Sequence, residues 1–356
     1  MLEIHDPAGA FERIEAYLRA EGFFIEGGVG ASGRCADVYL GYALSDPLRR
    51  TQRRAPPEPA ALPMAACHVR DIVSPAVVAG GYQLGAWDQT WSASAYGDAI
   101  AAVRSAIAAG EVYQVNLVQH LQAPFEGDPA GVAGALGRFR PLMSRPLVGD
   151  GWAIVSASPE LFLSRRGDAI TTMPIKGTRP EGGTESLSES EKDAAEHVMI
   201  VDLERNDLGR VSRPGSLSWP QVMAARDMAG VVHLVSRVEG QARAGLSWAA
   251  LVAATFPGGS VTGAPKIAAL DHIAALEPVG RGASMGAFGT VWPNGDFDLV
   301  LTIRTFAIVD ERIHLWVGGG IVWDSESEAE VEESWVKARP LLDALAVGAT
   351  RAPVSA

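Results

Sequence analysis

The most informative stretch of this sequence for fold and function is Thr172-Met173-Pro174-Ile175-Lys176-Gly177-Thr178-Arg179-Pro180. Pro174 and Gly177 flank Lys176, and because proline fixes the backbone dihedral φ, the lysine is expected to lie in a turn of defined shape. An apolar run over residues 169–175 leads into this turn and predicts a strand. A single loop lysine is usually solvated, so the neighbouring segments decide how Lys176 is interpreted.

An acidic helix is predicted shortly after this turn, over residues 188–208. Ser190 is a candidate N-cap, and Gly209 is a typical helix terminator. Asp193 and Glu196 are three residues apart, so both project from one face of the helix. On spacing alone, the pair is either a solvated acidic face or part of a cation site.

A second acidic helix is predicted near the C-terminus, over residues 328–345. Glu330, Glu333 and Lys337 follow one another at helical spacing and form one stripe. This stripe alone is compatible with a solvated face and an ordinary ion pair. The two acidic helices together would instead suit a hard cation such as Mg²⁺, which prefers a few carboxylate oxygens and retained waters.

The composition is that of a folded protein with a large core. The chain has 356 residues, of which 47% are hydrophobic and 20% are charged. A net charge of −12 disfavours nucleic acid and anionic membranes as partners. The two cysteines, Cys35 and Cys67, have neither metal-ligand spacing nor the density of a disulfide framework. Because we find neither a long apolar run nor a signal-peptide pattern, we expect a cytoplasmic protein.

Hydrophobic periodicity and turn residues predict the remaining organisation. Residues 1–90 are expected to be a shortened N-terminal region that contributes strands to the same fold, residues 91–346 the functional core, and residues 347–356 a frayed tail. Further helices are predicted over residues 96–109, 125–140, 247–255 and 264–275. Strands are predicted over residues 111–117, 152–163, 169–173, 297–309 and 312–317.

Several other motifs have ordinary structural explanations when each is taken singly. Arg304 follows Ile303 in an alternating strand pattern, and arginine suits bidentate recognition of a carboxylate. His233 lies in an apolar strand, where a lone histidine is usually a satisfied core residue. The run of glycines at residues 318–320 permits a close approach of the backbone to a ligand or to another strand.

Taken together, the motifs resemble the chorismate-utilising enzymes, which include anthranilate, isochorismate and salicylate synthases and the large component of aminodeoxychorismate synthase. The resemblance covers residues 95–345 and includes at least six motifs in family order. It implies an α+β fold in which two facing antiparallel β-sheets are flanked by helices, with the active site in the cleft between them.

The resemblance also implies catalytic and metal-binding roles. Lys176 would be a nucleophile that forms a covalent intermediate, Glu160 the general acid, and His233 a histidine near the ring hydroxyl of the substrate. Desolvation at the edge of an apolar strand would raise the pKa of a glutamate such as Glu160, which suits a proton donor. The implied ligands of Mg²⁺ are Glu196 and Glu333, with Asp193 and Glu330 as water-mediated ligands.

Substrate contacts are implied in the same way. The residues that would bind the two carboxylates of chorismate are Arg304, Lys337, Gly318 and Gly320. Further contacts are implied for Ser260, Gln114 and Thr178. Ser260 stands where family members commonly have threonine and keeps the hydroxyl, whereas Ser284 stands where a tyrosine or tryptophan is usual.

Two positions distinguish the reactions within the family. Anthranilate synthases usually have alanine in place of Lys176, and the water-using synthases have lysine in place of Gln114. The resemblance therefore implies amination of chorismate to aminodeoxychorismate, which leads to p-aminobenzoate and folate. Since neither cysteine lies in a glutaminase motif, ammonia is expected from a separate glutamine amidotransferase subunit. The alternatives are an anthranilate synthase component, an isochorismate or salicylate synthase, and a non-catalytic chorismate-binding subunit.

Overall fold

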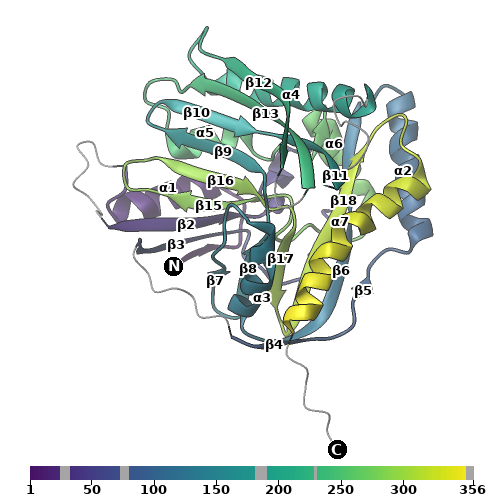
Figure 1. Ribbon diagram of the computed structural model, residues 1–356. Coiled ribbons are helices and arrows are strands. Elements are labelled where there is room, and N and C mark those ends of the chain that lie inside the picture. Colours follow the sequence, from purple (N-terminus) through teal and green to yellow (C-terminus); the bar gives the residue numbers. More distant parts are fainter. Residues whose placement is uncertain (25–32, 73–79, 181–190, 228–230, 350–356) are drawn as a thin grey trace, which may run out of the picture.

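The computed structural model describes residues 1–24, 33–72, 80–180, 191–227 and 231–349, with only the backbone of residues 176–180, 191–196, 226–227 and 231–233. Within this part of the chain, the strands form two antiparallel sheets, one of ten strands and one of eight, and helices cover their outer faces (Figure 1). The predicted α+β architecture is confirmed. None of the described helices is both long enough and apolar enough to cross a membrane.

The ten-stranded sheet combines the N-terminal strands with strands from the middle of the chain. In one of its strands, β2 (Arg34–Leu40), six of the seven residues are buried, so both faces of the sheet are covered there. The strand order is β1 (Leu2–Ile4), β3 (Ala65–Asp71), β2 (Arg34–Leu40), β15 (Ala287–Val291), β16 (Phe297–Leu301), β9 (Leu161–Arg166), β10 (Ala169–Met173), β13 (Val231–Gln241) and β11 (Ile175–Pro180), and β12 (Ser218–Asp227) also pairs with β13.

The eight-stranded sheet is built around two long strands that pair over ten positions, β6 (Gln114–Gly127) and β18 (Arg312–Ile321). β14 (Gly263–Ala264) pairs with the start of β6. On the other side of β18 lie β17 (Thr305–Val309), β8 (Trp152–Ser156) and β7 (Leu147–Val148). Two short strands, β4 (Tyr82–Leu84) and β5 (Asp88–Gln89), also pair with β6.

Helices pack against both sheets, and several begin at capping side chains that satisfy free backbone N–H groups. The side chains of Ser92, Asp128 and Ser247 each accept a hydrogen bond from the first turn of the helix that follows. The α-helices are α1 (Ala10–Ala20), α2 (Ala93–Ala108), α3 (Pro129–Leu136), α4 (Glu191–Val211), α5 (Trp248–Thr255), α6 (Lys266–Leu276) and α7 (Ser327–Gly348), and the short 3₁₀ helices are η1 (Tyr42–Leu48) and η2 (Gly137–Phe139).

Three sequence predictions of single elements were wrong in an informative way. The helix predicted over residues 125–140 begins only at Pro129, because residues 125–127 still belong to β6. The strands predicted over residues 152–163 and 297–309 are each two strands, and in both cases the chain leaves one sheet and enters the other. Because both halves of each segment are apolar and buried, their hydrophobic pattern gives no sign of the break.

The two crossings between the sheets lie side by side. Leu301 N–H donates to the carbonyl of Glu160 at 3.0 Å, and Ala157 N–H donates to the carbonyl of Arg304 at 2.9 Å. β8 pairs with β17 before the crossing, and β9 pairs with β16 after it. The fold therefore places Glu160 and Arg304 together where the two sheets meet.

A buried ion pair ties the core strand β6 to the segment after α6. The Arg281 guanidinium contacts both carboxylate oxygens of Glu277, at 2.7 and 2.9 Å, and both side chains are 2% exposed. Arg281 also donates to the carbonyls of Asn116 at 2.7 Å and Val261 at 2.8 Å. These contacts compensate the burial of both charges.

Replacing Arg281 with methionine is expected to lower the free energy of unfolding by about 3–5 kcal/mol, because Glu277 is left as an unpaired buried charge. Denaturant unfolding followed by circular dichroism measures the loss. The double variant Arg281→Met with Glu277→Gln is the control, and it should recover part of the stability. A loss below about 1 kcal/mol in the single variant would contradict this view of the pair.

Candidate active site

Arg304 occupies a backbone conformation that a strand does not provide. Its φ is +50°, in the left-handed region that non-glycine residues rarely adopt, and it lies between β16 and β17. The prediction that Arg304 alternates with Ile303 within a strand was therefore wrong. Strained backbone of this kind clusters at functional sites, and here it accompanies the passage of the chain from one sheet to the other.

The surroundings of Arg304 suit the binding of an anion. Burial lowers the pKa of its guanidinium, while the nearby carboxylate of Glu160 acts in the opposite direction. Within the described part of the chain, the Arg304 guanidinium donates no hydrogen bond to another residue. A carboxylate placed there would accept charge-assisted hydrogen bonds.

Glu160 is itself buried and is held by its neighbours. It is 5% exposed, its backbone N–H donates to Ser158 Oγ at 3.3 Å, and its Oε1 accepts a hydrogen bond from Ser260 Oγ at 2.9 Å. The structure thus brings Glu160, Arg304 and Ser260 together, as a shared site requires. Their chemical roles remain predictions.

Ser260 belongs to the turn at residues 256–263, which connects α5 to β14. Thr262 accepts a hydrogen bond from Asn116 N–H of β6 at 2.9 Å, and β14 then pairs with Gln114 and Val115. The side chain of Gln114 is fully buried, and its amide nitrogen and oxygen have no partner among the described residues. A buried amide without partners is costly, so a ligand that bonds to it would gain affinity.

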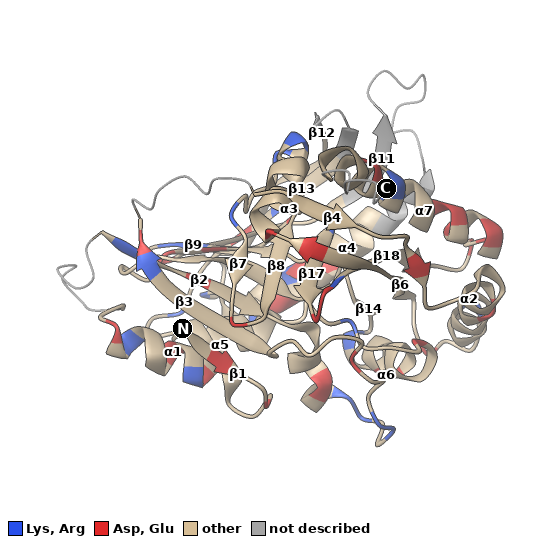
Figure 2. Cartoon of the chain, turned by 90° about the horizontal axis from the view of Figure 1, so that it is seen from below, with Lys and Arg blue, Asp and Glu red and all other residues tan. Residues whose placement is uncertain are grey.

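A second group of predicted residues lies on β18 and α7. Lys337 Nζ donates to the Gly318 carbonyl and to Glu333 Oε1, both at 2.8 Å. Gly318 has a packing reason to be glycine, since a Cβ there would lie 1.9 Å from the carbonyl oxygen of Leu117. Gly320 pairs with Asn116 two positions further along β18. Figure 2 shows acidic residues distributed along α7.

Glu330 and Glu333 of α7 lie close together over the glycines of β18 at residues 318–320. Glu330 Oε2 and Glu333 Oε1 each lie 3.5 Å from the point that a Cβ on Gly319 would occupy, and Lys337 Nζ lies 3.4 Å from it. Glu330 is 6% exposed, and its other oxygen accepts a hydrogen bond from Ser325 Oγ at 2.6 Å. Carboxylate oxygens gathered in this way fit a hard divalent cation.

Five predicted residues have only a described backbone. Lys176 lies on β11 opposite Leu234, so the prediction that it lies in a turn was wrong, because β11 pairs with β13 at this position. The neighbouring strand β13 carries His233. The remaining three are Thr178 on β11 and Asp193 and Glu196 in the first turns of α4. Their side chains, like the predicted cap Ser190, lie outside the described residues. Among the side chains that are described, no group of three or more His, Cys, Asp or Glu gathers as a metal site, but half of the predicted ligand set is not among them.

The structure also reveals buried charges that the sequence analysis missed. Glu204 and Asp207 of α4 are 4% and 3% exposed, and Asp207 forms an ion pair with Lys266 Nζ at 2.5 Å. Glu204 Oε1 accepts a hydrogen bond from Gly259 N–H at 3.3 Å. A signal was present, because Glu204 and Asp207 continue the helical stripe that begins at Asp193 and Glu196.

The environment of Glu204 predicts a dependence of stability on pH. Burial, reinforced by the nearby carboxylates of Asp207 and Glu160 and partly opposed by the ammonium of Lys266 and the hydrogen bond from Gly259 N–H, raises the pKa of Glu204 from 4.5 to about 8. Since the folded chain binds this proton more tightly than the unfolded chain does, the contribution is fully present below pH 4.5 and is lost as the pH rises toward 8.

Glu204→Gln removes this titration. The free energy of unfolding of the variant minus that of the parent chain is therefore expected to rise by roughly 2–4 kcal/mol when the pH is raised from 5 to 8. A pKa difference of 1 between the folded and unfolded chain corresponds to about 1.4 kcal/mol. Denaturant unfolding at both pH values measures the difference. An equal stability difference at pH 5 and pH 8 would show that Glu204 titrates normally.

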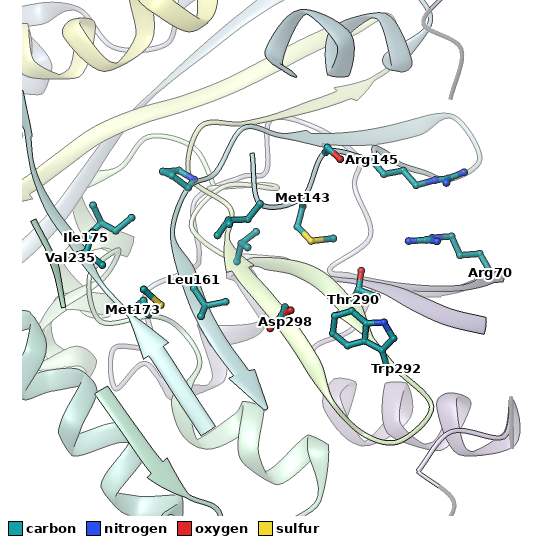
Figure 3. Close-up of a pocket in the computed structure, with 14 residues that line it drawn as sticks. Arg70, Met143, Arg145, Leu161, Met173, Ile175, Val235, Thr290, Trp292 and Asp298 are labelled. Atoms are coloured by element: carbon teal, nitrogen blue, oxygen red, sulfur yellow. The ribbon is translucent and has the colours of Figure 1, made fainter. Parts of the chain in front are cut away.

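A ligand-sized cavity lies beside this site, over the ten-stranded sheet. Its volume is about 690 Å³, and Pro159 and Leu161 are among its lining residues, whereas Glu160 between them turns to Ser260. Figure 3 shows Arg70 and Arg145 at one end of the cavity and the apolar Ile175 at the other. The cavity and the Glu160 site therefore lie on two sides of the same segment.

Comparison with known proteins identifies the family. The model of the chorismate binding enzyme family matches residues 50–343, which is most of the chain. The chain belongs to this family. Among solved structures, anthranilate synthase component I from Streptococcus pneumoniae TIGR4 is similar, with a TM-score of 0.79 and 25% sequence identity over 92% of this chain and 85% of that chain.

Curated relatives of this chorismate binding enzyme carry two different names at nearly equal similarity. Anthranilate synthase component 1 1 of Haloarcula marismortui is 41% identical over 259 residues, which are 70% of this chain and 53% of the relative. Aminodeoxychorismate synthase component 1 of Klebsiella aerogenes is 39% identical over 269 residues, 73% of this chain and 60% of the relative. The chain thus spans between half and two thirds of the length of these relatives.

Proposed function

We propose that this chorismate binding enzyme aminates chorismate to aminodeoxychorismate and retains the enolpyruvyl group. The observation that carries the proposal is Lys176, at a position where the family resemblance leads us to expect alanine in anthranilate synthases. The lysine lies on β11 beside β13, the strand of His233. The similarity to aminodeoxychorismate synthase component 1 of Klebsiella aerogenes supports the proposal.

The proposed reaction has two displacement steps. Neutral Lys176 forms a C–N bond to the ring, the ring double bonds shift, and the ring hydroxyl leaves as water with a proton from Glu160. Ammonia then attacks the carbon that lost the hydroxyl, the double bonds shift back, and Lys176 leaves as an amine. Glu160 regains the proton that the attacking nitrogen releases, so chorismate and ammonia give aminodeoxychorismate and water.

Cationic groups would hold the substrate during these steps. The Arg304 guanidinium has no hydrogen-bond acceptor among the described residues, and Lys337 Nζ donates to the carbonyl of Gly318 on β18. Their local positive charge would favour a dianionic substrate even though the chain as a whole carries a net charge of −12. The amide of Gln114 would bond to the substrate or to ammonia, since water-using relatives have a lysine there.

Glu330 and Glu333 are proposed to hold Mg²⁺ together with Asp193 and Glu196. When bound, the cation would neutralise carboxylate charge at the substrate. Removing divalent cations with EDTA is expected to abolish chorismate consumption, and added Mg²⁺ should restore it. Glu333→Gln should require at least about tenfold more Mg²⁺ for half-maximal activity, because one anionic ligand is lost. Full activity of the parent chain in EDTA would contradict the proposed requirement.

Ammonia is proposed to come from a separate glutamine amidotransferase subunit, because the two buried cysteines of this chain do not suit glutamine hydrolysis. Supplied ammonium should replace that subunit in vitro. A second candidate function, anthranilate synthesis, is favoured by the similarity to the Haloarcula marismortui protein. The two are distinguished by incubating the chain with chorismate, Mg²⁺ and ammonium and identifying the product, since anthranilate has lost the enolpyruvyl group.

A further inference from the structure

We propose that Glu204 is a positioning residue of this active site, which joins the strand leading to Lys176 to the turn that holds Ser260 against Glu160. The functions of Ser260 and Glu160 in this inference rest on the proposed function. The contacts of Glu204 do not depend on it.

Glu204 bonds to two segments that are distant in sequence. Its Oε1 accepts the Gly259 N–H at 3.3 Å, and its Oε2 accepts the Thr172 hydroxyl at 3.5 Å. Thr172 lies on β10, which leads through Pro174 into β11 and Lys176. Gly259 directly precedes Ser260, whose hydroxyl donates to Glu160 at 2.9 Å. The buried carboxyl group of Glu204 therefore links the strand that leads to Lys176 with the turn that carries Ser260.

The turn approaches α4 so closely that a side chain at Gly259 would require Leu203 of the helix to move. A Cβ on Gly259 would lie 2.4 Å from Leu203 Cδ2 and 3.4 Å from Glu204 Oε1. The Gly259 carbonyl in turn accepts hydrogen bonds from the N–H groups of Thr262 and Gly263, at 3.1 and 3.0 Å. A shift of the Gly259 amide would therefore move the whole turn, Ser260 included.

Stability alone does not account for an acid at this position. Asp207, one turn further along α4, is paired with Lys266, whereas Glu204 forms no ion pair with a described side chain and feels the charge of Lys266 only from a distance. A buried acid without a cation costs free energy that an apolar residue would save. The raised pKa of Glu204 indicates that it is mostly protonated at neutral pH, so glutamine, a neutral hydrogen-bonding side chain of the same shape, should replace it.

The test compares Glu204→Met, which keeps the shape and loses both hydrogen bonds, with Glu204→Gln. The glutamine amide oxygen can accept the bond from Gly259 N–H, and its NH₂ group can donate to the Thr172 hydroxyl in the reverse direction. Glu15→Met is the control, because Glu15 is also a buried helix carboxylate that accepts a backbone N–H, from Ala249 at 2.8 Å, although unlike Glu204 it is also paired with Arg19 at 2.6 Å. The rate of amide hydrogen exchange at Gly259, resolved with overlapping peptides, measures how firmly the turn at residues 256–263 is held. The kcat and KM of chorismate consumption measure the effect on the active site.

We expect Glu204→Met to speed exchange at Gly259 by about tenfold, which corresponds to the loss of one hydrogen bond. Its kcat should fall by about ten- to a hundredfold while KM changes little, because the substrate still binds but Glu160 is misplaced. Glu204→Gln should restore both quantities to within about threefold of the parent chain, and Glu15→Met should leave both unchanged.

Unchanged exchange at Gly259 in Glu204→Met would overturn the inference whatever reaction the enzyme performs. Faster exchange with an unchanged kcat would overturn it as well. If the parent chain forms another product, the proposed function fails, but the same comparison of exchange and chorismate consumption still tests Glu204. If the parent chain consumes no chorismate at all, the positioning role is overturned together with the proposed function.

Discussion

Lys176→Ala is expected to lower the kcat for formation of aminodeoxychorismate by about a thousandfold or more, because the variant lacks the nucleophile of the first step. The product should be quantified by chromatography and mass spectrometry with chorismate, Mg²⁺ and ammonium in excess. Lys176→Arg is the matched control. It keeps the positive charge but is a poor nucleophile, so it should be nearly as inactive as the alanine variant.

The covalent step can also be observed directly. Without ammonia, the parent chain mixed with chorismate should gain the mass of chorismate less one water, and neither Lys176 variant should do so. If Lys176→Ala still aminated chorismate fully at the same ring position, the covalent route would be wrong. An active Lys176→Arg variant would instead assign the lysine a purely electrostatic role.

Glu160→Gln is expected to reduce kcat by about a hundred- to ten-thousandfold with little change in KM, because glutamine cannot deliver the proton that the leaving hydroxyl needs. The amide oxygen of glutamine can still accept the hydrogen bond from Ser260, which spans 2.9 Å in the parent chain. Its structure should therefore be preserved, and circular dichroism and thermal unfolding check this.

Ser260→Ala separates positioning by the hydroxyl from proton transfer by Glu160. The variant loses the hydrogen bond to Glu160 Oε1 and keeps the acid, so we expect a drop in kcat of about tenfold. A Glu160→Gln variant that retains more than about a third of the parent kcat would mean that another group supplies the proton.

The architecture could be predicted from the sequence because its signals are distributed along the chain. The acidic helix predicted over residues 328–345 corresponds to α7 (Ser327–Gly348), since its polar stripe and its apolar stripe both have helical period. The two facing sheets, in contrast, followed from the family resemblance. Local periodicity would not have supplied them, because strand pairing between distant segments leaves no local pattern.

The crossings between the sheets could not be predicted. Residues 152–163 and 297–309 are apolar on both sides of the break, and burial of both halves removes the alternation that would mark a strand end. The left-handed backbone of Arg304 is imposed by tertiary structure, since arginine has no local preference for it. The geometry of Glu160 and Arg304 therefore became visible only in three dimensions.

The site residues divide in a similar way. Glu330, Glu333 and Lys337 were found because their spacing places them on one helix face, and the structure does bring them together over Gly319. Glu204 was not predicted, although it continues the stripe of Asp193 and Glu196, because a polar stripe on a helix is usually a solvated face. Its burial depends on the turn at Gly259, which is 55 residues away in sequence.

The most direct test of the proposed function is to identify the product that the purified chain forms from chorismate, Mg²⁺ and ammonium, with and without an added aminodeoxychorismate lyase. We predict an aminated product that retains its enolpyruvyl group and that the lyase converts to p-aminobenzoate. Anthranilate would show that Lys176 does not decide the reaction, and isochorismate would overturn the inference from Gln114. Either product, or no turnover, would contradict the assignment of this chain as an aminodeoxychorismate-forming enzyme.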